Sequence, residues 1–165
     1  MRALSILAIA LGALILAAPA WAQDVSYVAH DTTVGIQPPD GWRVENTPGQ
    51  PLNIVSTDYS VAITTSIVVV NTPPDELAAY IMSQLQADPD QKEPAALTIS
   101  GHDASAYRSA MIDKSGRHKN LRFITLRLDS GAVLLCMVMT QDNLTAAQQS
   151  AADAAVSTLT IAPGD

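Results

Sequence analysis

Three long β-type segments follow one another near the C-terminus and are joined by short connections. Residues 104–112, 121–128 and 132–140 are rich in apolar side chains, and the connections contain Ser115-Gly116 and Ser130-Gly131. Connections this short allow only antiparallel pairing, because parallel strands need a crossover of about a dozen residues or more. The sequence therefore predicts an antiparallel meander, against which the rest of the chain has to pack.

Further strands are expected before this meander. Short runs of alternating or β-branched residues occupy positions 25–29, 33–37, 52–56, 60–70 and 97–100. Between the second and third of these runs, the sequence Pro-Pro-Asp-Gly-Trp at 38–42 is a predicted turn, since proline fixes φ and Asp-Gly favours positive φ.

Two helices interrupt the strands. The first is expected to have Thr72 as its N-cap and Pro73 as its first helical residue. Its expected apolar face consists of Leu77, Tyr80, Ile81 and Leu85. The second helix begins with the capping-box sequence from Thr145 to Gln148 and runs to about residue 158. Its expected inner face consists of Ala147, Ala151, Ala154 or Ala155, and Leu159.

This order of elements predicts the fold class. The helices interrupt the strands instead of alternating with them, which favours an α+β fold over a doubly wound parallel sheet. We expect an antiparallel β-sheet with flanking helices, an α/β/α sandwich, in a single domain that spans residues 23–165.

The N-terminus has the three parts of a secretory signal peptide. Arg2 supplies a positive charge, residues 4–18 are almost wholly apolar, and Ala20-Trp21-Ala22 offers small residues at the −3 and −1 positions of a cleavage site. We expect a signal peptide over residues 1–22 that is cleaved after Ala22. Cleavage there places the mature protein in the periplasm or outside the cell.

An uncleaved membrane anchor is the alternative. The apolar run is shorter than the ~20 residues that a membrane-spanning helix needs, and no later segment is long enough for a second span. The cleavage site has no cysteine to which a lipid could be attached. Cleavage is therefore the favoured interpretation, and no membrane span is expected after it.

The elements also resemble a known superfamily. The Pro-Asp-Gly-Trp turn at 39–42, the helix start at 74–77, the strand that begins near Gly101, the hairpin at 119–140 and the serine-containing helix end at 155–159 are similar to those of PsbP-like/DcrB-like domains. The resemblance implies an antiparallel sheet sandwiched between helices. It implies no catalytic residues, because photosystem assembly factors, periplasmic lipoproteins and Ran-binding proteins share this scaffold. The chain lacks the lipidated cysteine of the lipoprotein members.

Charge is distributed unevenly along the predicted mature chain. Residues 23–104 carry 11 acidic and 2 basic side chains, residues 105–127 carry 6 basic and 1 acidic, and residues 128–165 carry 4 acidic ones. A basic hairpin on an acidic body, together with the turn at 38–42, is a candidate docking point for an anionic partner. The candidate contact residues are Lys114, Arg117, His118, Lys119 and Arg122. The alternative is a solvated hairpin, with Arg122 and Arg127 paired to neighbouring carboxylates.

Two His-Asp doublets are the strongest candidates for metal chemistry. Metal-dependent phosphohydrolases use such a doublet with further ligands, because a metal needs three or more groups that converge on it. Both His30-Asp31 and His102-Asp103 are expected at turns or strand ends, where neighbouring side chains diverge. Whether His30 and His102 meet depends on strand pairing. No nucleophile elbow, phosphate-binding loop or zinc-protease motif is present, so no cofactor is expected.

The sulfur-containing residues are expected in the core. Cys136 is the single cysteine and lies within the apolar run at 132–139, where we expect a shielded thiol and no nucleophile. Met137 and Met139 share one strand face, which favours core packing over a soft-metal site because no third sulfur or histidine is spaced to join them.

We therefore expect an exported, non-enzymatic binding or assembly accessory, with a periplasmic or envelope protein as its partner. A nucleic-acid partner is not expected, given the net negative charge and the few aromatic residues. Two alternatives remain. One is a small metal-binding hydrolase that uses the His-Asp doublets, and the other is a carrier of a small apolar ligand between sheet and helix.

Overall fold

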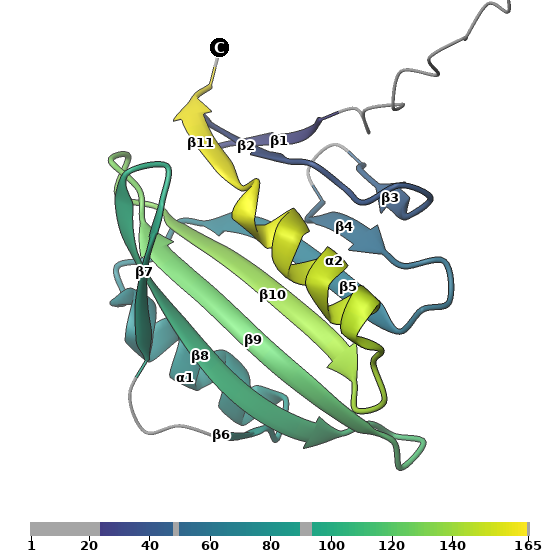
Figure 1. Ribbon diagram of the computed structural model, residues 1–165. Coiled ribbons are helices and arrows are strands. Elements are labelled where there is room, and N and C mark those ends of the chain that lie inside the picture. The colour runs from purple at the N-terminus through teal and green to yellow at the C-terminus, as the bar shows by residue number, and fades with distance from the viewer. Residues whose placement is uncertain (1–23, 48–49, 90–93, 165) are drawn as a thin grey trace, which may run out of the picture.

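The computed structural model of the chain describes residues 24–47, 50–89 and 94–164. The large sheet has the spatial order β3 (Arg43–Glu45), β4 (Leu52–Val55), β5 (Val61–Val68), β10 (Val133–Gln141), β9 (His118–Arg127) and β8 (His102–Ile112), and β8 also pairs with β6 (Asp88–Pro89) and β7 (Ala95–Ile99). A small sheet consists of β1 (Val25–Ala29), β2 (Thr32–Ile36) and β11 (Thr160–Pro163). Helix α1 (Pro74–Gln84) lies on one face of the large sheet, and helix α2 (Ala146–Ser157) lies on the other (Figure 1). The predicted α+β fold with flanking helices is confirmed.

The predicted meander forms the centre of the large sheet. Strands β8, β9 and β10 pair in sequence order, and every strand pair between the described residues is antiparallel. Gly116 and Gly131 adopt φ values of +80° and +82° at the two hairpin connections. A left-handed backbone costs glycine little because it has no Cβ atom.

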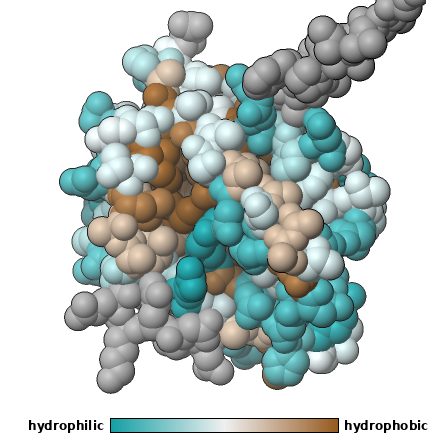
Figure 2. Space-filling view, in the orientation of Figure 1, coloured by the Kyte–Doolittle hydropathy of each residue, from teal (hydrophilic) through white to brown (hydrophobic). Residues whose placement is uncertain are grey.

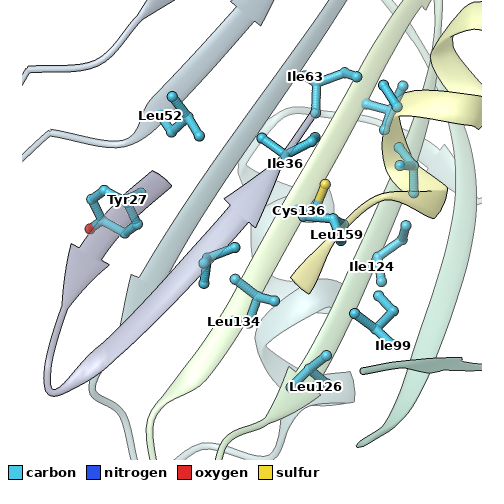
Figure 3. Packing of buried hydrophobic residues seen from close by; sticks show 14 of the residues in the cluster. Tyr27, Ile36, Leu52, Ile63, Ile99, Ile124, Leu126, Leu134, Cys136 and Leu159 are labelled. Atoms are coloured by element: carbon cyan, nitrogen blue, oxygen red, sulfur yellow. The ribbon is translucent and has the colours of Figure 1, made fainter. Parts of the chain in front are cut away.

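The main core lies between the large sheet and the layer of α2 and the small sheet. Figure 3 shows Ile36 of the small sheet close to Ile63, Cys136 and Leu159, whereas Tyr27 lies toward Leu52 at the side of the same cluster. The thiol of Cys136 is 0% exposed, and burial raises its pKa to about 11. The prediction of a shielded cysteine is confirmed, because the thiolate is the reactive form.

The predicted capping box at the start of α2 is present. The Thr145 hydroxyl accepts a hydrogen bond from the Gln148 backbone N–H, and the Gln148 side chain accepts one from the Thr145 backbone N–H. The expected inner face is only partly right, because Ala147 and Ala154 are exposed. The buried residues of α2 are Ala152, Ala155 and Val156. A run of alanines carries too little contrast in hydrophobicity to set the rotation of a helix.

Helix α1 begins one residue later than expected. Pro73 is the N-cap, Pro74 is the first helical residue, and no side chain caps the helix. The carbonyl of Thr72, the residue expected to cap α1, instead accepts a hydrogen bond from Arg127 Nη2. Tyr80 was expected on the apolar face but is 61% exposed. The fully packed residues of α1 are Ala78 and Met82.

A second cluster of apolar side chains lies between α1 and the large sheet. Met82 of α1 packs there with Leu121 and Phe123 of β9. Met137 and Met139 are half-buried against the same cluster, which confirms core packing for these two methionines. Met82 belongs to this cluster and Met111 packs against it, so the expectation that no third sulfur joins Met137 and Met139 was wrong. No helix within the described part of the chain is long and apolar enough to cross a membrane.

Strand β11 is absent from the sequence prediction. It begins three residues after the end of α2 and pairs with β2, so that β1, β2 and β11 form a sheet of their own. Four residues with largely exposed side chains do not establish a period of two. From the sequence, only the β1 and β2 strands of the small sheet could therefore be predicted.

One carboxylate links α2 to the turn between β4 and β5. Asp58 Oδ1 accepts hydrogen bonds of 2.7 Å from the hydroxyls of Ser60 and Ser56, and Asp58 Oδ2 accepts one from Gln148 Nε2 of α2. The Ser60 and Ser56 hydroxyls lower the pKa of Asp58 from its ordinary value of 3.8 to about 2. The ionised form is therefore favoured in the folded state.

We expect Asp58→Asn to remove stability that depends on pH. Because the folded-state pKa is about 2 and the ordinary value is 3.8, the carboxylate stabilises the fold above the ordinary value and loses this effect as the pH falls from 3.8 to 2. Urea unfolding of wild type and variant should differ near neutral pH and converge near pH 2. Asp40→Asn, at an exposed carboxylate in the 38–42 turn, is the control. A difference for Asp58→Asn that persists at low pH would contradict this role.

Candidate functional site

A groove runs between α2 and the β7–β8–β9 side of the large sheet. It contains two hollows, with volumes of about 490 Å³ and 410 Å³, which meet at Arg122 of β9 and Asp153 of α2. We call the two hollows together the α2 groove. In Figure 2, a hydrophobic hollow lies beside a hydrophilic band on this face of the molecule.

The larger hollow of the α2 groove is polar. Each wall contributes a side chain that is able to hydrogen-bond a ligand: Arg108 from β8, Asn120 from β9, Thr140 from β10 and Gln149 from α2. Gln149 and Asp153 are one turn apart on α2 and therefore share one helix face. This hollow offers mainly hydrogen-bond donors.

The smaller hollow is the more apolar of the two. Its walls include Leu97 and Ile99 of β7, Val156 of α2 and Leu159, which follows α2. Among these, Ile99, Val156 and Leu159 belong to the buried core, so the hollow continues the core towards the surface. Hydroxyl groups also line it, from Thr98, Ser100 and Ser157.

An ion pair separates the two hollows. Arg122 Nη1 lies 2.9 Å from Asp153 Oδ1, and Gln149 Nε2 donates a 3.1 Å hydrogen bond to Asp153 Oδ2. The Arg122 side chain is 25% exposed, and its Nε atom is buried without a hydrogen-bond partner in the described structure. A buried donor without a partner costs about 1–3 kcal/mol, so this guanidinium retains capacity for an acceptor.

A second arginine faces the first. Arg108 of β8 lies directly opposite Arg122 of β9 in the antiparallel register. Like charges at directly opposed positions of a sheet are destabilising. Because Asp153 is the carboxylate that lines the two hollows, the groove has two guanidinium groups for one carboxylate. Its charge therefore suits an anionic ligand.

The five contact residues predicted from the sequence do not form one patch. Lys114 and His118 are exposed at the hairpin, and Arg117 pairs with Asp113 at 2.9 Å. Lys119 is 8% exposed, and the alternation of β9 places it on the α1 face, opposite Met111 and Gln141. Arg122 lies in the α2 groove.

The alternative interpretation of the basic segment is half right. Arg122 does pair with a carboxylate, that of Asp153. Arg127 instead donates hydrogen bonds to the backbone carbonyls of Val70, Thr72 and Gly131, so it ties the β9–β10 hairpin to the segment before α1.

The His-Asp doublets lie at the opposite end of β8 from the hairpin tip. His30 and Asp31 form the tight β1–β2 turn, with φ values of 50° and 57°. Asp31, His102 and Asp129 line a third hollow of about 180 Å³, whereas His30 does not. Among the described residues, no group of three or more His, Cys, Asp or Glu side chains is placed to hold a metal ion.

Of the polar residues that line the α2 groove, only Arg122 was predicted as a site residue; those that were missed include Arg108, Asn120, Gln149 and Asp153. Arg108 belongs to the basic segment, and the hairpin signal at Ser115-Gly116 could have placed it opposite Arg122. A turn centred on Ser115 pairs residues whose numbers are equally far from 115, as 108 and 122 are. No sequence signal placed α2 beside this pair.

We expect Arg108→Gln to stabilise the folded chain, because it removes a like charge opposite Arg122. The expected gain is about 0.2–1 kcal/mol in the free energy of unfolding, measured with urea at low salt. Arg117→Gln is the matched control, since it removes the same charge from the exposed ion pair with Asp113 and should leave stability unchanged or slightly lower. Destabilisation by Arg108→Gln would show that the groove does not hold unrelieved repulsion.

No protein-family model and no curated protein matches the sequence. Solved structures do match the fold. LpqN of Mycobacterium tuberculosis, described as involved in cell envelope biogenesis, aligns with a TM-score of 0.61 at 18% identity, over 86% of this chain and 91% of its own. Cyanobacterial PsbP from Synechocystis sp. PCC 6803 aligns with a TM-score of 0.60 at 12% identity, over 92% and 99%.

A third solved structure extends the comparison. PA94 of Pseudomonas aeruginosa, a protein of unknown function described as a putative regulator, aligns with a TM-score of 0.53 at 17% identity, over 85% of this chain and 98% of its own. Identities this low support the fold alone. The order of the strands, the helix on each face of the large sheet and these three alignments agree, and the chain therefore has the PsbP-like fold.

Proposed function

We propose that the protein is an exported, non-enzymatic binding protein of the cell envelope, and that the α2 groove is its binding site. The observation that carries the proposal is the opposition of Arg108 and Arg122 in a groove with the single carboxylate of Asp153. Two facing guanidinium groups do not stabilise a sheet, but they provide a fork of donors for a carboxylate or phosphate.

The chemistry of the groove supports binding over catalysis. Its polar side chains are guanidinium, amide and hydroxyl groups and one ion-paired carboxylate. The described residues that line the two hollows include no histidine, cysteine or lysine, the side chains that most often act as bases or nucleophiles near neutral pH. These groups recognise an anion better than they transfer protons.

Export is proposed from the N-terminal sequence. The signal peptide expected over residues 1–22 lies outside the described residues. An envelope location is compatible with the involvement of LpqN in cell envelope biogenesis, and this supports the proposal. The partner we propose is a periplasmic or envelope component with an anionic group.

The basic hairpin has a separate proposed role. Lys114 and His118 are exposed near the tip, a short distance along β8 and β9 from Arg108 and Arg122. We propose that these side chains, with Arg117, attract an anionic partner towards the groove. Such attraction mainly raises the association rate and is weakened by salt.

Cleavage after Ala22 predicts a defined mature protein. Intact-mass measurement of the natively expressed protein should find a chain that begins at Gln23, recovered outside the cytoplasm. Ala22→Arg should block processing, because the −1 position requires a small residue, whereas Trp21→Leu at the −2 position should be processed normally. Recovery of the full-length chain from the cytoplasm would contradict the export proposal.

Binding through the groove predicts a different partner set for two charge-reversed variants. Each mature variant is cross-linked in a native periplasmic extract, and the captured components are identified by mass spectrometry. Arg108→Glu should lose the components captured by the wild type, because the introduced carboxylate would neutralise Arg122 and repel an anion. The Lys114→Glu/Arg117→Glu variant should capture the same components more slowly, and the slowing should disappear at high salt.

The opposite result would place the binding site at the hairpin instead of the groove. If Arg108→Glu retained every component and the hairpin variant lost them, the hairpin would be the contact surface and the groove proposal would fail. Circular dichroism and thermal melting of both variants confirm that any loss reflects binding and not unfolding.

A further inference from the structure

We infer that the α2 groove binds a single-chain anionic amphiphile, with its headgroup at Arg108 and Arg122 and its alkyl chain in the apolar hollow. The inference rests on the proposed function, since it uses the same groove and names the class of ligand. A ligand with two chemically different parts would fit the different linings of two hollows that share Arg122 and Asp153.

The headgroup site is defined by two guanidinium groups with free donors. Arg108 is exposed, and it has no hydrogen-bond or ion-pair partner within the described part of the chain. Arg122 uses Nη1 for Asp153, but its buried Nε has no partner among the described residues. A carboxylate or phosphate oxygen at this point would accept hydrogen bonds from the exposed Arg108 guanidinium and from the exposed part of Arg122, and would relieve the repulsion between the arginines.

The apolar hollow provides the site for an alkyl chain. Its 410 Å³ lie between Leu97 and Ile99 on the sheet and Val156 and Leu159 at the α2 end. Apolar walls make the transfer of each methylene group from water favourable. The hollow continues the main core, so a bound chain would contact side chains that are already ordered.

The distance between the two parts sets the length of the chain. Ala104 lies four residues before Arg108 on β8 and is the register partner of Leu97 on β7. At ~3.3 Å per residue, the arginine site and the apolar wall are about 13 Å apart along the strand. An alkyl chain of medium length spans this distance.

The floor of the groove favours an alkyl chain over a peptide. Strand β9 pairs with β8 and β10, and the part of β8 beside the apolar hollow pairs with β7 and β9, so the backbone groups of these two strands are already used there. A peptide laid across them would bring its own N–H and C=O groups to a floor with few free partners, and unpaired polar groups are costly to bury. An alkyl chain brings none.

The test is isothermal titration calorimetry on the mature chain, residues 23–165, with probes below their micelle-forming concentrations. Sodium decanoate and decyl phosphate should each bind with a stoichiometry of one, and their relative affinity distinguishes a carboxylate from a phosphate headgroup. Decyl maltoside, which has the same chain and a neutral headgroup, should bind at least about tenfold more weakly. Acetate and inorganic phosphate, which lack the chain, should give no measurable binding.

Variants separate the headgroup site from the chain site. Arg108→Gln should weaken decanoate binding about tenfold, and Arg43→Gln, at an exposed ion-paired arginine on β3, should leave it unchanged. Ser157→Trp should block chain binding, because Ser157 is exposed and lines the apolar hollow. Each variant is checked by thermal melting, since Arg108 and Ser157 are both exposed and their replacement should leave the fold intact.

Equal binding of decanoate and decyl maltoside, or no effect of Arg108→Gln, would overturn the inference. If no amphiphile binds but Arg108→Glu still loses the natively captured components, the ligand class is wrong and the groove remains the binding site. An acidic protein segment captured at the same arginines would be the corresponding outcome. If no amphiphile binds and Arg108→Glu also retains every native component, the proposed function fails as well.

Discussion

The register of the β8–β9 hairpin determines on which face of the large sheet each of its side chains lies, and the packing on both faces depends on it. Asp113 Oδ1 accepts hydrogen bonds from the backbone N–H groups of Ser115 and Arg117, and this turn pairs Ile112 with His118. Hydrogen bonds from the Ser115 hydroxyl and the Arg117 backbone hold the pKa of Asp113 well below its usual range. A slip of one residue would move every side chain of one strand to the other face. Arg122 would then leave the groove, and its neighbours in the core would leave with it.

The groove follows from small side chains placed around this register. On the α2 face of β8, Ala104 and Ala106 precede Arg108, and alanines of α2 bring that helix close to β5 and β10. The helix therefore covers one half of the large sheet closely and leaves the β7–β9 half open. The open half carries the two arginines. The position of α2 on the sheet therefore leaves a hollow that is also positively charged.

Sequence reasoning reached the features that repeat along the chain. Long strands with short connections gave the meander, and the apolar run around Cys136 gave the buried centre of the sheet. It failed where the signal is short or uniform. The four residues of β11 and the alanine-rich face of α2 offer too little contrast to locate a partner or a rotation. The groove depends on the rotation of α2, together with contacts distant in sequence such as Arg122–Asp153, so it could not be derived from local patterns.

Helix α2 is held at both of its ends. Near its start, Gln148 donates to Asp58 of the β4–β5 turn, and at its end the Thr158 hydroxyl accepts a hydrogen bond from the Gln37 backbone before β11 joins the small sheet. A helix held at both of its ends is not free to open and close over the groove as a lid. A ligand of the proposed site would therefore enter along the open side of the groove and exchange without a conformational gate, and the protein would select it by shape and charge alone.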